Sequence, residues 1–179
     1  MRKLSMDELG RLSTASFKAA DKIPVIAVLD NVRSGLNVGS VFRTADAFLI
    51  EAVYVCGYSP QPPHRDVLKS ALGSTETVSW DGFDTITDGI KSLKSHGYKI
   101  YAVEQVERSI SLLDFYPLKG EKIALIFGNE VNGVSEEALA LVDGCIEVPQ
   151  WGSKHSLNIS VCAGIVIWDV VLKVRNQLG

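Results

Sequence analysis

The sequence predicts an α/β fold with a mostly parallel sheet flanked by helices. Its 179 residues are 46% hydrophobic, which is enough for one well-buried core and short for two domains. Brief apolar runs rich in valine and isoleucine alternate with segments of helical period, and this alternation is typical of parallel sheets covered by helices. Three loops rich in glycine and asparagine each follow an apolar run, at residues 31–40, 128–133 and 149–158. Loops at the carboxyl ends of such strands build one ligand pocket.

The N-terminal half supplies two strands and one helix. The apolar run Pro24–Leu29 predicts the first strand, and Ala52–Cys56 predicts the second. Between them, Asn37–Leu49 has an apolar stripe of helical period, with Asn37 as the predicted N-cap. The following segment, Gly57–Trp80, is the longest irregular stretch of the chain. It is interpreted either as a mobile loop that faces a substrate or as a simple connection.

The C-terminal half continues the alternation. Helical patterns and apolar runs follow one another in this order: helix Thr85–His96, strands Lys99–Val103 and Lys122–Phe127, helix Glu136–Val142 and strand Cys145–Val148. The last helix, about Leu157–Gln177, is apolar on almost every side through Trp168, so the sheet or another chain must cover most of its faces. Ser156 is its predicted N-cap. Asn158 has no obvious local partner, which favours a role in a site or in fixing the loop.

The composition excludes several classes of protein. Cys56, Cys145 and Cys162 are odd in number, far apart and set among apolar residues, which indicates buried free thiols rather than disulfides or a metal site. Free thiols point to a reducing compartment. The first residues lack an apolar signal core, and the most apolar stretch, Ile159–Trp168, is too short to span a membrane. We therefore expect a cytoplasmic protein without a metal or a membrane anchor.

The charge distribution leaves room for a polyanion only locally. The net charge of -3 argues against binding nucleic acid through overall charge. Residues 1–22 nevertheless hold five basic and three acidic side chains, and we interpret them as a basic helical extension in front of a main domain at 23–179. An ordinary solvated surface explains the same charges equally well.

The first loop carries two arginines beside a helix start. Gly39 and Arg43 are four residues apart, so they share a face that lies away from the apolar stripe. Because helical side chains lean towards the N-terminus, we expect the guanidinium of Arg43 to approach the loop that holds Arg33 and Asn37. Such an arrangement suits a phosphate or another anion. The alternative is an ion pair between Arg43 and Asp46 or another acid at the surface.

The second and third loops argue against nucleotide hydrolysis and for a polar site. Val134 stands where a phosphate-binding P-loop requires lysine, and no Gly-x-Gly-x-x-Gly stretch occurs. Glu130 lies between two glycines at a strand end and is available to accept hydrogen bonds from the backbone or from a ligand. Lys154 and His155 are candidates for contacts with a polyanion, although a solvated loop tip is the default interpretation.

Taken in order and spacing, the three loops resemble the three motifs of the SpoU branch of the SPOUT RNA methyltransferases. The matching positions are Asn37-x-Gly39-x-x-x-Arg43, Phe127-Gly-x-Glu130-x-x-Gly133 and Val148-Pro-x-x-Gly152-x-x-x-Ser156-Leu-Asn158-Ile-Ser160. The similarity covers essentially Pro24–Trp168. The Val-Pro-Gln and Ile-Trp-Asp surroundings look like the TrmH-like branch, which modifies guanosine ribose in tRNA.

This resemblance implies methyl transfer from S-adenosylmethionine to a ribose 2'-hydroxyl, with tRNA as the expected RNA and ribosomal RNA as the alternative. A catalytically weak RNA-binding module of the same fold is the rival of a different class. The resemblance also implies a homodimer and a C-terminal trefoil knot, which ordinary chain topology disfavours.

The same resemblance assigns roles to individual residues. The cofactor would lie against Val103, Gly128, Val148, Ser156 and Leu157. The reacting centre would be surrounded by Asn37, Arg43, Glu130, Ser156 and Asn158, and RNA would contact Arg33, Lys154 and His155. Because an arginine stays protonated, a role as general base is physically awkward. We expect Arg43 to bind the neighbouring phosphate and to stabilise the developing alkoxide.

Overall fold

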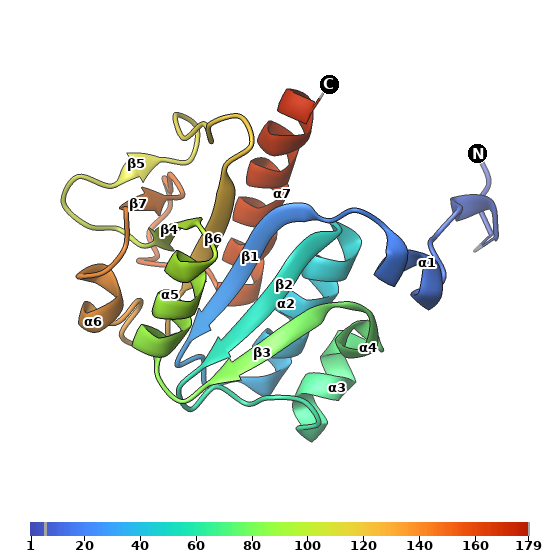
Figure 1. The fold of residues 1–179 in the computed structure, drawn as a ribbon, viewed down its shortest axis with the longest axis horizontal. Helices are drawn as coiled ribbons and strands as arrows, with labels where there is room; N and C mark the ends of the chain where they lie inside the picture. Colours follow the sequence, from blue (N-terminus) through green and yellow to red (C-terminus); the bar gives the residue numbers. More distant parts are fainter. Residues whose placement is uncertain (6, 179) are drawn as a thin grey trace.

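A seven-stranded sheet forms the centre of the computed structural model, which describes residues 1–5 and 7–178 (Figure 1). In sheet order the strands are β3 (Ser79–Phe83), β2 (Ile50–Cys56), β1 (Ile23–Asp30), β6 (Lys122–Phe127), β4 (Tyr98–Val103), β7 (Gly144–Glu147) and β5 (Ile110–Ser111). Every pairing between neighbours is parallel. The predicted α/β class is therefore confirmed, and all five predicted strands are present.

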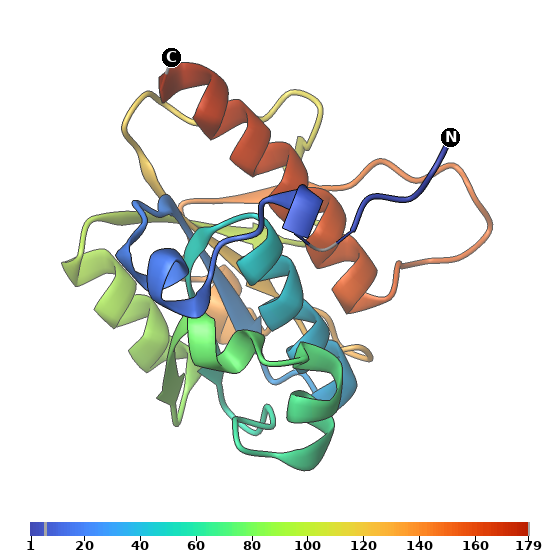
Figure 2. The ribbon, with the colours of Figure 1, turned by 90° about the vertical axis from the view of Figure 1, so that its right-hand side faces the viewer.

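Helices cover both faces of this sheet (Figures 1 and 2). One layer holds α1 (Thr14–Ala19), α2 (Gly35–Ala47), α3 (Arg65–Ala71), α4 (Ser74–Thr77) and α7 (Ile159–Leu178). The other holds α5 (Ile86–Ser95) and α6 (Glu136–Leu139). A 3-10 turn, η1 (Asp7–Leu9), precedes α1. Successive strand residues point to opposite faces, so Val25, Ala27 and Leu29 join the first layer while Ile26 and Val28 join the second.

The stretch Gly57–Trp80 is more regular than the sequence predicts. It contains α3, α4 and the start of β3. Both helices are short, at seven and four residues, so neither shows a full period of apolar positions. Strand β3 lies at the edge of the sheet, and none of its five residues is buried, so it lacks the apolar run of a central strand.

Two predicted N-caps are wrong. Helix α2 begins at Gly35, and the hydroxyl of Ser34 accepts the N–H of Asn37 at 3.3 Å, so Asn37 lies inside the first turn. Helix α7 begins at Ile159, and the side-chain oxygen of Asn158 accepts the N–H of Ser160 at 2.9 Å. Asn158, rather than Ser156, thus caps α7.

Helix α7 is covered on one side only. Its buried residues face α2 and the sheet: Ile159, Ala163, Val166, Ile167, Val170, Val171 and Val174. Four large apolar side chains remain 38–52% exposed, and we call them the α7 stripe: Val161, Ile165, Trp168 and Leu172. Their spacing of four, three and four residues places them along one face of the helix. A single chain therefore leaves uncovered part of the apolar surface that the sequence predicts to be buried.

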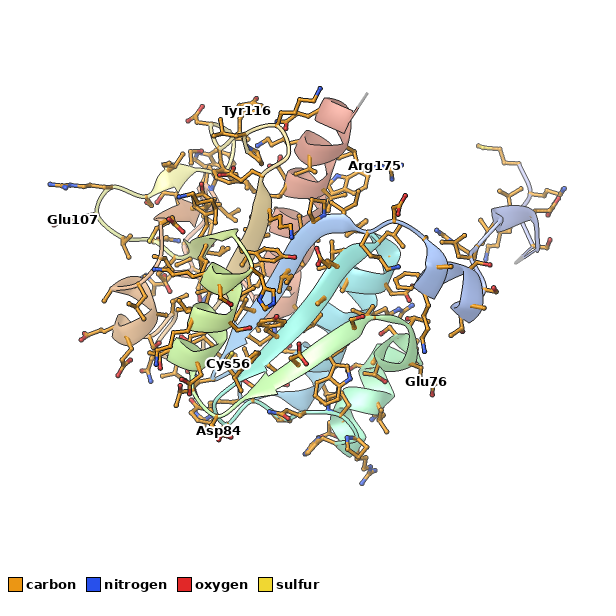
Figure 3. The ribbon with its side chains drawn as sticks, in the orientation of Figure 1. Cys56, Glu76, Asp84, Glu107, Tyr116 and Arg175 are labelled. Atoms are coloured by element: carbon orange, nitrogen blue, oxygen red, sulfur yellow. The ribbon has the colours of Figure 1, made fainter. Side chains whose placement is uncertain are left out.

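Other expectations concern the thiols, the membrane and the topology. Cys56, Cys145 and Cys162 are free, as predicted. Cys56, at the end of β2 in Figure 3, is also buried, whereas Cys145 and Cys162 are partly exposed, so the predicted burial is wrong for these two. None of the helices within residues 1–5 and 7–178 is both long enough and apolar enough to cross a bilayer. The trefoil knot and the domain boundary at residue 22 stay predictions.

Candidate functional site

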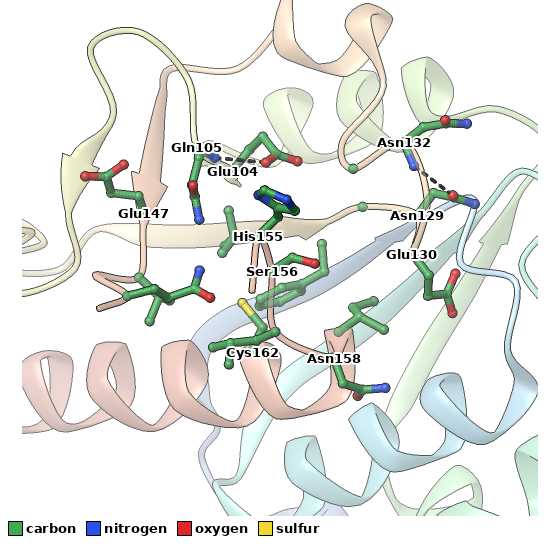
Figure 4. A pocket seen from close by; sticks show the side chains of 18 of the residues that line it. Glu104, Gln105, Asn129, Glu130, Asn132, Glu147, His155, Ser156, Asn158 and Cys162 are labelled. Carbon is green, nitrogen blue, oxygen red and sulfur yellow. Dashed lines mark hydrogen bonds between the residues drawn. The ribbon is translucent and has the colours of Figure 1, made fainter. Parts of the chain in front are cut away.

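A pocket of about 520 Å³ lies at the carboxyl edge of the sheet, where β4, β6 and β7 end (Figure 4). The loop that leads into α7 closes one side of it. Its walls include all five residues expected to contact the cofactor: Val103, Gly128, Val148, Ser156 and Leu157. Glu130, Asn158 and His155 line the same pocket. The second and third glycine- and asparagine-rich loops thus form its walls, at the carboxyl edge of the parallel sheet. The first loop, which the sequence predicts to share this pocket, does not line it.

Hydrogen bonds join all three loops beside this pocket. The amide of Asn158 donates to the side-chain oxygen of Asn37 at 3.3 Å, and the amide of Asn37 donates to Oε1 of Glu130 at 2.9 Å. Glu130 also accepts the backbone N–H groups of Arg33 at 3.0 Å and Ser34 at 3.2 Å. We call Asn37, Glu130 and Asn158 the brace. It connects segments about a hundred residues apart, so it fixes the loops relative to one another.

The hydrogen bonds around Glu130 lower the pKa of its carboxyl group. Partial burial raises the pKa of this carboxyl group, but hydrogen bonds from Arg33, Asn37, its own backbone N–H and Ser34 outweigh that effect and leave the pKa below its ordinary value. Glu130 is therefore ionised at neutral pH. An ionised carboxylate accepts hydrogen bonds more strongly than a neutral acceptor, which strengthens the connection between the loops.

Sequence reasoning missed the residues that shape the second loop. Asn129 is 7% exposed, and its amide donates to the backbone oxygen of Asn31 at 2.8 Å and to the hydroxyl of Tyr58 at 2.7 Å. Its oxygen accepts the N–H of Val131 at 2.8 Å. A Cβ on Gly128 would lie 2.1 Å from the backbone nitrogen of Val134, so only glycine fits there. An asparagine next to Gly128, directly after the apolar run Lys122–Phe127, was the signal available in the sequence for Asn129.

The pocket is electrostatically negative. Three carboxylates line it, from Glu104, Glu130 and Glu147, and its lining among the described residues contains no lysine or arginine. Glu104 accepts the N–H groups of Val134 at 3.0 Å and Gln105 at 2.9 Å, and Glu147 accepts the hydroxyl of Ser109 at 2.9 Å. A cationic ligand suits such a cavity. Glu104 and Glu147 were also missed, although each is an acid at the end of a predicted strand.

Arg43 lies outside the lining of this pocket. It lines a second groove of about 460 Å³ between α2 and α3, together with Lys69 and Ser70, and it does not line the pocket. The alternative ion pair with Asp46 is not formed either; Asp46 accepts a hydrogen bond from Thr77. Helix α3 lies in Gly57–Trp80, which has no helical pattern in the sequence, so the sequence does not predict this groove.

The remaining predicted contacts with RNA are exposed. Arg33 and Lys154 lie at the surface outside the pocket lining, whereas His155 faces into the pocket in Figure 4. Within residues 1–5 and 7–178, no group of three histidine, cysteine or acidic side chains is arranged to hold a metal ion.

The fold and the pocket define a class of protein: an α/β domain that binds a small ligand at the carboxyl ends of its parallel strands. The sequence model of the SpoU rRNA Methylase family matches residues 24–168, and the chain belongs to this family.

Relatives and solved structures agree with this family. A tRNA (guanosine(18)-2'-O)-methyltransferase of Thermus thermophilus is 33% identical over 144 residues, which cover 79% of this chain and 71% of the relative. A 23S rRNA (guanosine-2'-O-)-methyltransferase of Blochmanniella floridana is 31% identical, over 88% of this chain and 61% of the relative. The crystal structure of an AdoMet-bound rRNA methyltransferase from Sinorhizobium meliloti has the same fold, with a TM-score of 0.78 at 22% identity; the match covers 91% of this chain and 60% of that one. Against two further bacterial relatives, the chain spans 65% and 62% of their length.

Proposed function

We propose that this chain transfers a methyl group from S-adenosylmethionine to a ribose 2'-hydroxyl of RNA, with guanosine in tRNA as the first substrate to test. The observation that carries the proposal is the acidic pocket, which two of the motif loops form and the brace stabilises. The relative from Thermus thermophilus supports tRNA, since it matches over most of both chains and is named as a tRNA methyltransferase. Ribosomal RNA is the alternative substrate.

The pocket fits the cofactor in size and in charge. Its volume of about 520 Å³ is within the range of small-molecule sites. S-adenosylmethionine carries a positive sulfonium, which supplies the electrophilic methyl group when the cofactor is bound, and the carboxylates of Glu104, Glu130 and Glu147 complement that charge. Val103, Val148 and Leu157 provide apolar wall for the adenine ring. Ser156 is exposed and has no hydrogen-bond partner among the described side chains, so its hydroxyl is free for the ligand.

The brace acts by positioning. Asn37, Glu130 and Asn158 use their polar atoms largely on one another and on the backbone, so we assign them the task of holding the loops in register rather than contacting the ribose. Methyl transfer is an in-line displacement, and alignment of the reacting atoms supplies a large part of its acceleration. The free cation in the neighbouring groove, Arg43, would bind the phosphate next to the acceptor ribose.

We also propose a homodimer that buries the α7 stripe. Its four large apolar side chains form a continuous exposed row on a helix whose other face is fully packed. Exposed rows of this kind mark interaction surfaces. The free thiols of the chain favour a cytoplasmic location.

The proposal is tested by incubating the protein with labelled S-adenosylmethionine and unmodified tRNA or ribosomal RNA, followed by nucleoside mass spectrometry. The wild type should form a 2'-O-methylated nucleoside. Arg43→Ala should lower methylation by about 100-fold or more, because a phosphate contact and transition-state stabilisation are both lost. Calorimetry should show S-adenosylmethionine affinity within about twofold of the wild type, because Arg43 lies outside the pocket. Lys91→Ala, which removes an exposed lysine of α5, serves as the matched control.

Two outcomes would contradict these assignments. Unchanged turnover of Arg43→Ala would remove Arg43 from the reaction. Failure of the wild-type protein to bind S-adenosylmethionine, with RNA binding retained, would favour the RNA-binding module over the enzyme.

A further inference from the structure

The groove between α2 and α3 owes its shape to two close helix contacts. A Cβ on Gly39 would lie 2.2 Å from both the hydroxyl of Ser70 and the backbone oxygen of Val67. A Cβ on Gly35 would lie 3.0 Å from the Cβ of Asp66. The glycines therefore let α3 pack directly on the first two turns of α2. This packing places Lys69, on the exposed side of α3, in the same groove as Arg43 of α2.

The groove presents two cations without any acid in its lining. Arg43 and Lys69 are both exposed, and neither forms an ion pair or a side-chain hydrogen bond with another described residue. The hydroxyl groups beside them have internal partners: Ser40 donates to the backbone oxygen of Leu36 at 2.8 Å, and Ser70 to that of Asp66 at 3.1 Å. The positive charge of the two long side chains therefore dominates what the groove can bind.

The groove and the pocket have opposite charge, and α2 connects the groove to the brace beside the pocket. Asn37 belongs to the brace beside the acidic pocket, and Arg43 stands six residues further along α2, about 9 Å along the axis at 1.5 Å per residue. The acidic pocket suits a cation, and it repels phosphates. A polyanion that reaches the pocket therefore needs positive charge close to its rim, and the groove adds two cations to the exposed Arg33 beside Glu130.

We propose that the groove between α2 and α3 is a binding site for the RNA backbone, in which Lys69 contacts a phosphate beside the one that Arg43 binds. This inference rests on the proposed function and extends it by a residue that none of the three motifs includes. Phosphates are the same in every nucleotide, so contacts with them do not read the base sequence. The groove therefore sets the position of the RNA strand, and other residues must recognise the bases. The other groove residues, among them Ser40, Ser70 and the exposed Leu72, are uncharged and leave space for the riboses of the RNA.

The test measures how salt changes RNA binding. Wild type, Lys69→Ala, Lys69→Glu and Lys69→Arg are titrated with an unmodified tRNA transcript by fluorescence anisotropy at several salt concentrations, with Lys91→Ala as the matched lysine control. We expect Lys69→Ala to raise the Kd about tenfold near physiological salt, Lys69→Glu to raise it further, and Lys69→Arg to stay close to the wild type. The slope of log K against log salt should become shallower by roughly one for Lys69→Ala, because one phosphate contact is lost. The S-adenosylmethionine affinity should remain within about twofold.

Two results would overturn the inference. The first is that Lys69→Ala and Lys69→Glu both bind RNA with the Kd and the salt slope of the wild type. The second is a change of oligomeric state in Lys69→Glu by sedimentation velocity with an unchanged salt slope, which would make the groove a contact between two copies. Failure of the proposed methylation gives a different result from either of these. The wild-type protein would form no methylated ribose, but the Lys69 variants would still have a changed salt slope.

Discussion

Glu130 shows how one side chain organises the site without necessarily touching the substrate. Its carboxylate receives hydrogen bonds from the first loop, and through Asn37 it is linked to the third. The sequence predicts that Glu130 accepts hydrogen bonds from the backbone or from a ligand, and the structure shows the backbone partners. The sequence does not predict the hydrogen bond between Asn37 and Asn158, because that bond depends on how the sheet places two residues 121 positions apart.

The lowered pKa of Glu130 leads to a prediction about stability and pH. A carboxyl group whose pKa is lower in the folded state adds stability above its unfolded pKa of about 4.5, and this contribution is lost as pH falls through the folded pKa. Glu130→Gln should therefore cost about 1 kcal/mol at pH 7, a small value because the side chain is partly exposed. The difference from the wild type should shrink as pH falls below about 4.5. Urea denaturation between pH 3 and 7 measures it, with Glu137→Gln, an exposed acid of α6, as the control. A difference independent of pH would contradict the role of the charge.

At the scale of elements, the contact between α2 and α3 depends on Gly39. In Gly39→Ala the new methyl group would meet the backbone of α3, which a rotamer change cannot relieve, so the helices must move apart. We expect a loss of about 1–3 kcal/mol in the free energy of unfolding. Gly144→Ala is the control, because its Cβ would lie at an ordinary 3.4 Å from the ring of Tyr101. Chemical denaturation measures both; equal stability of the two variants would show that α3 adapts without cost.

The α7 stripe leads to a prediction about assembly. Ile165→Glu places a charge in the middle of the proposed dimer interface, and burying it without a partner is unfavourable. We expect the dissociation constant of the dimer to rise about 30-fold or more, which corresponds to about 2 kcal/mol. Lys91→Glu changes the charge of an exposed residue of α5, in the other helix layer, and should leave the dimer intact. Sedimentation velocity distinguishes them, and a wild-type protein that is monomeric at all concentrations would contradict the dimer.

At the scale of the whole molecule, local patterns predicted the central strands well and the periphery poorly. The apolar runs of β1 and β6 are buried on both faces, so their composition alone identifies them. Strand β3 was missed because an edge strand needs no apolar run, and the cap of α7 was misplaced because Ser156 and Asn158 are both good capping residues. The separation of Arg43 from the pocket follows from tertiary packing, and no spacing in the sequence encodes it.

The long separation between the brace residues has a consequence for biosynthesis. Glu130 and Arg33 are 97 positions apart, and Asn158 and Asn37 are 121 apart. Contacts that distant form late in folding, since the loop-closure entropy must be overcome first. During translation the early strands can already collapse. The pocket, however, lacks the side formed by the loop that leads into α7 until residue 158 has left the exit tunnel. If the groove binds RNA as proposed, a nascent chain that already carries Arg43 and Lys69 would bind RNA before it could methylate it.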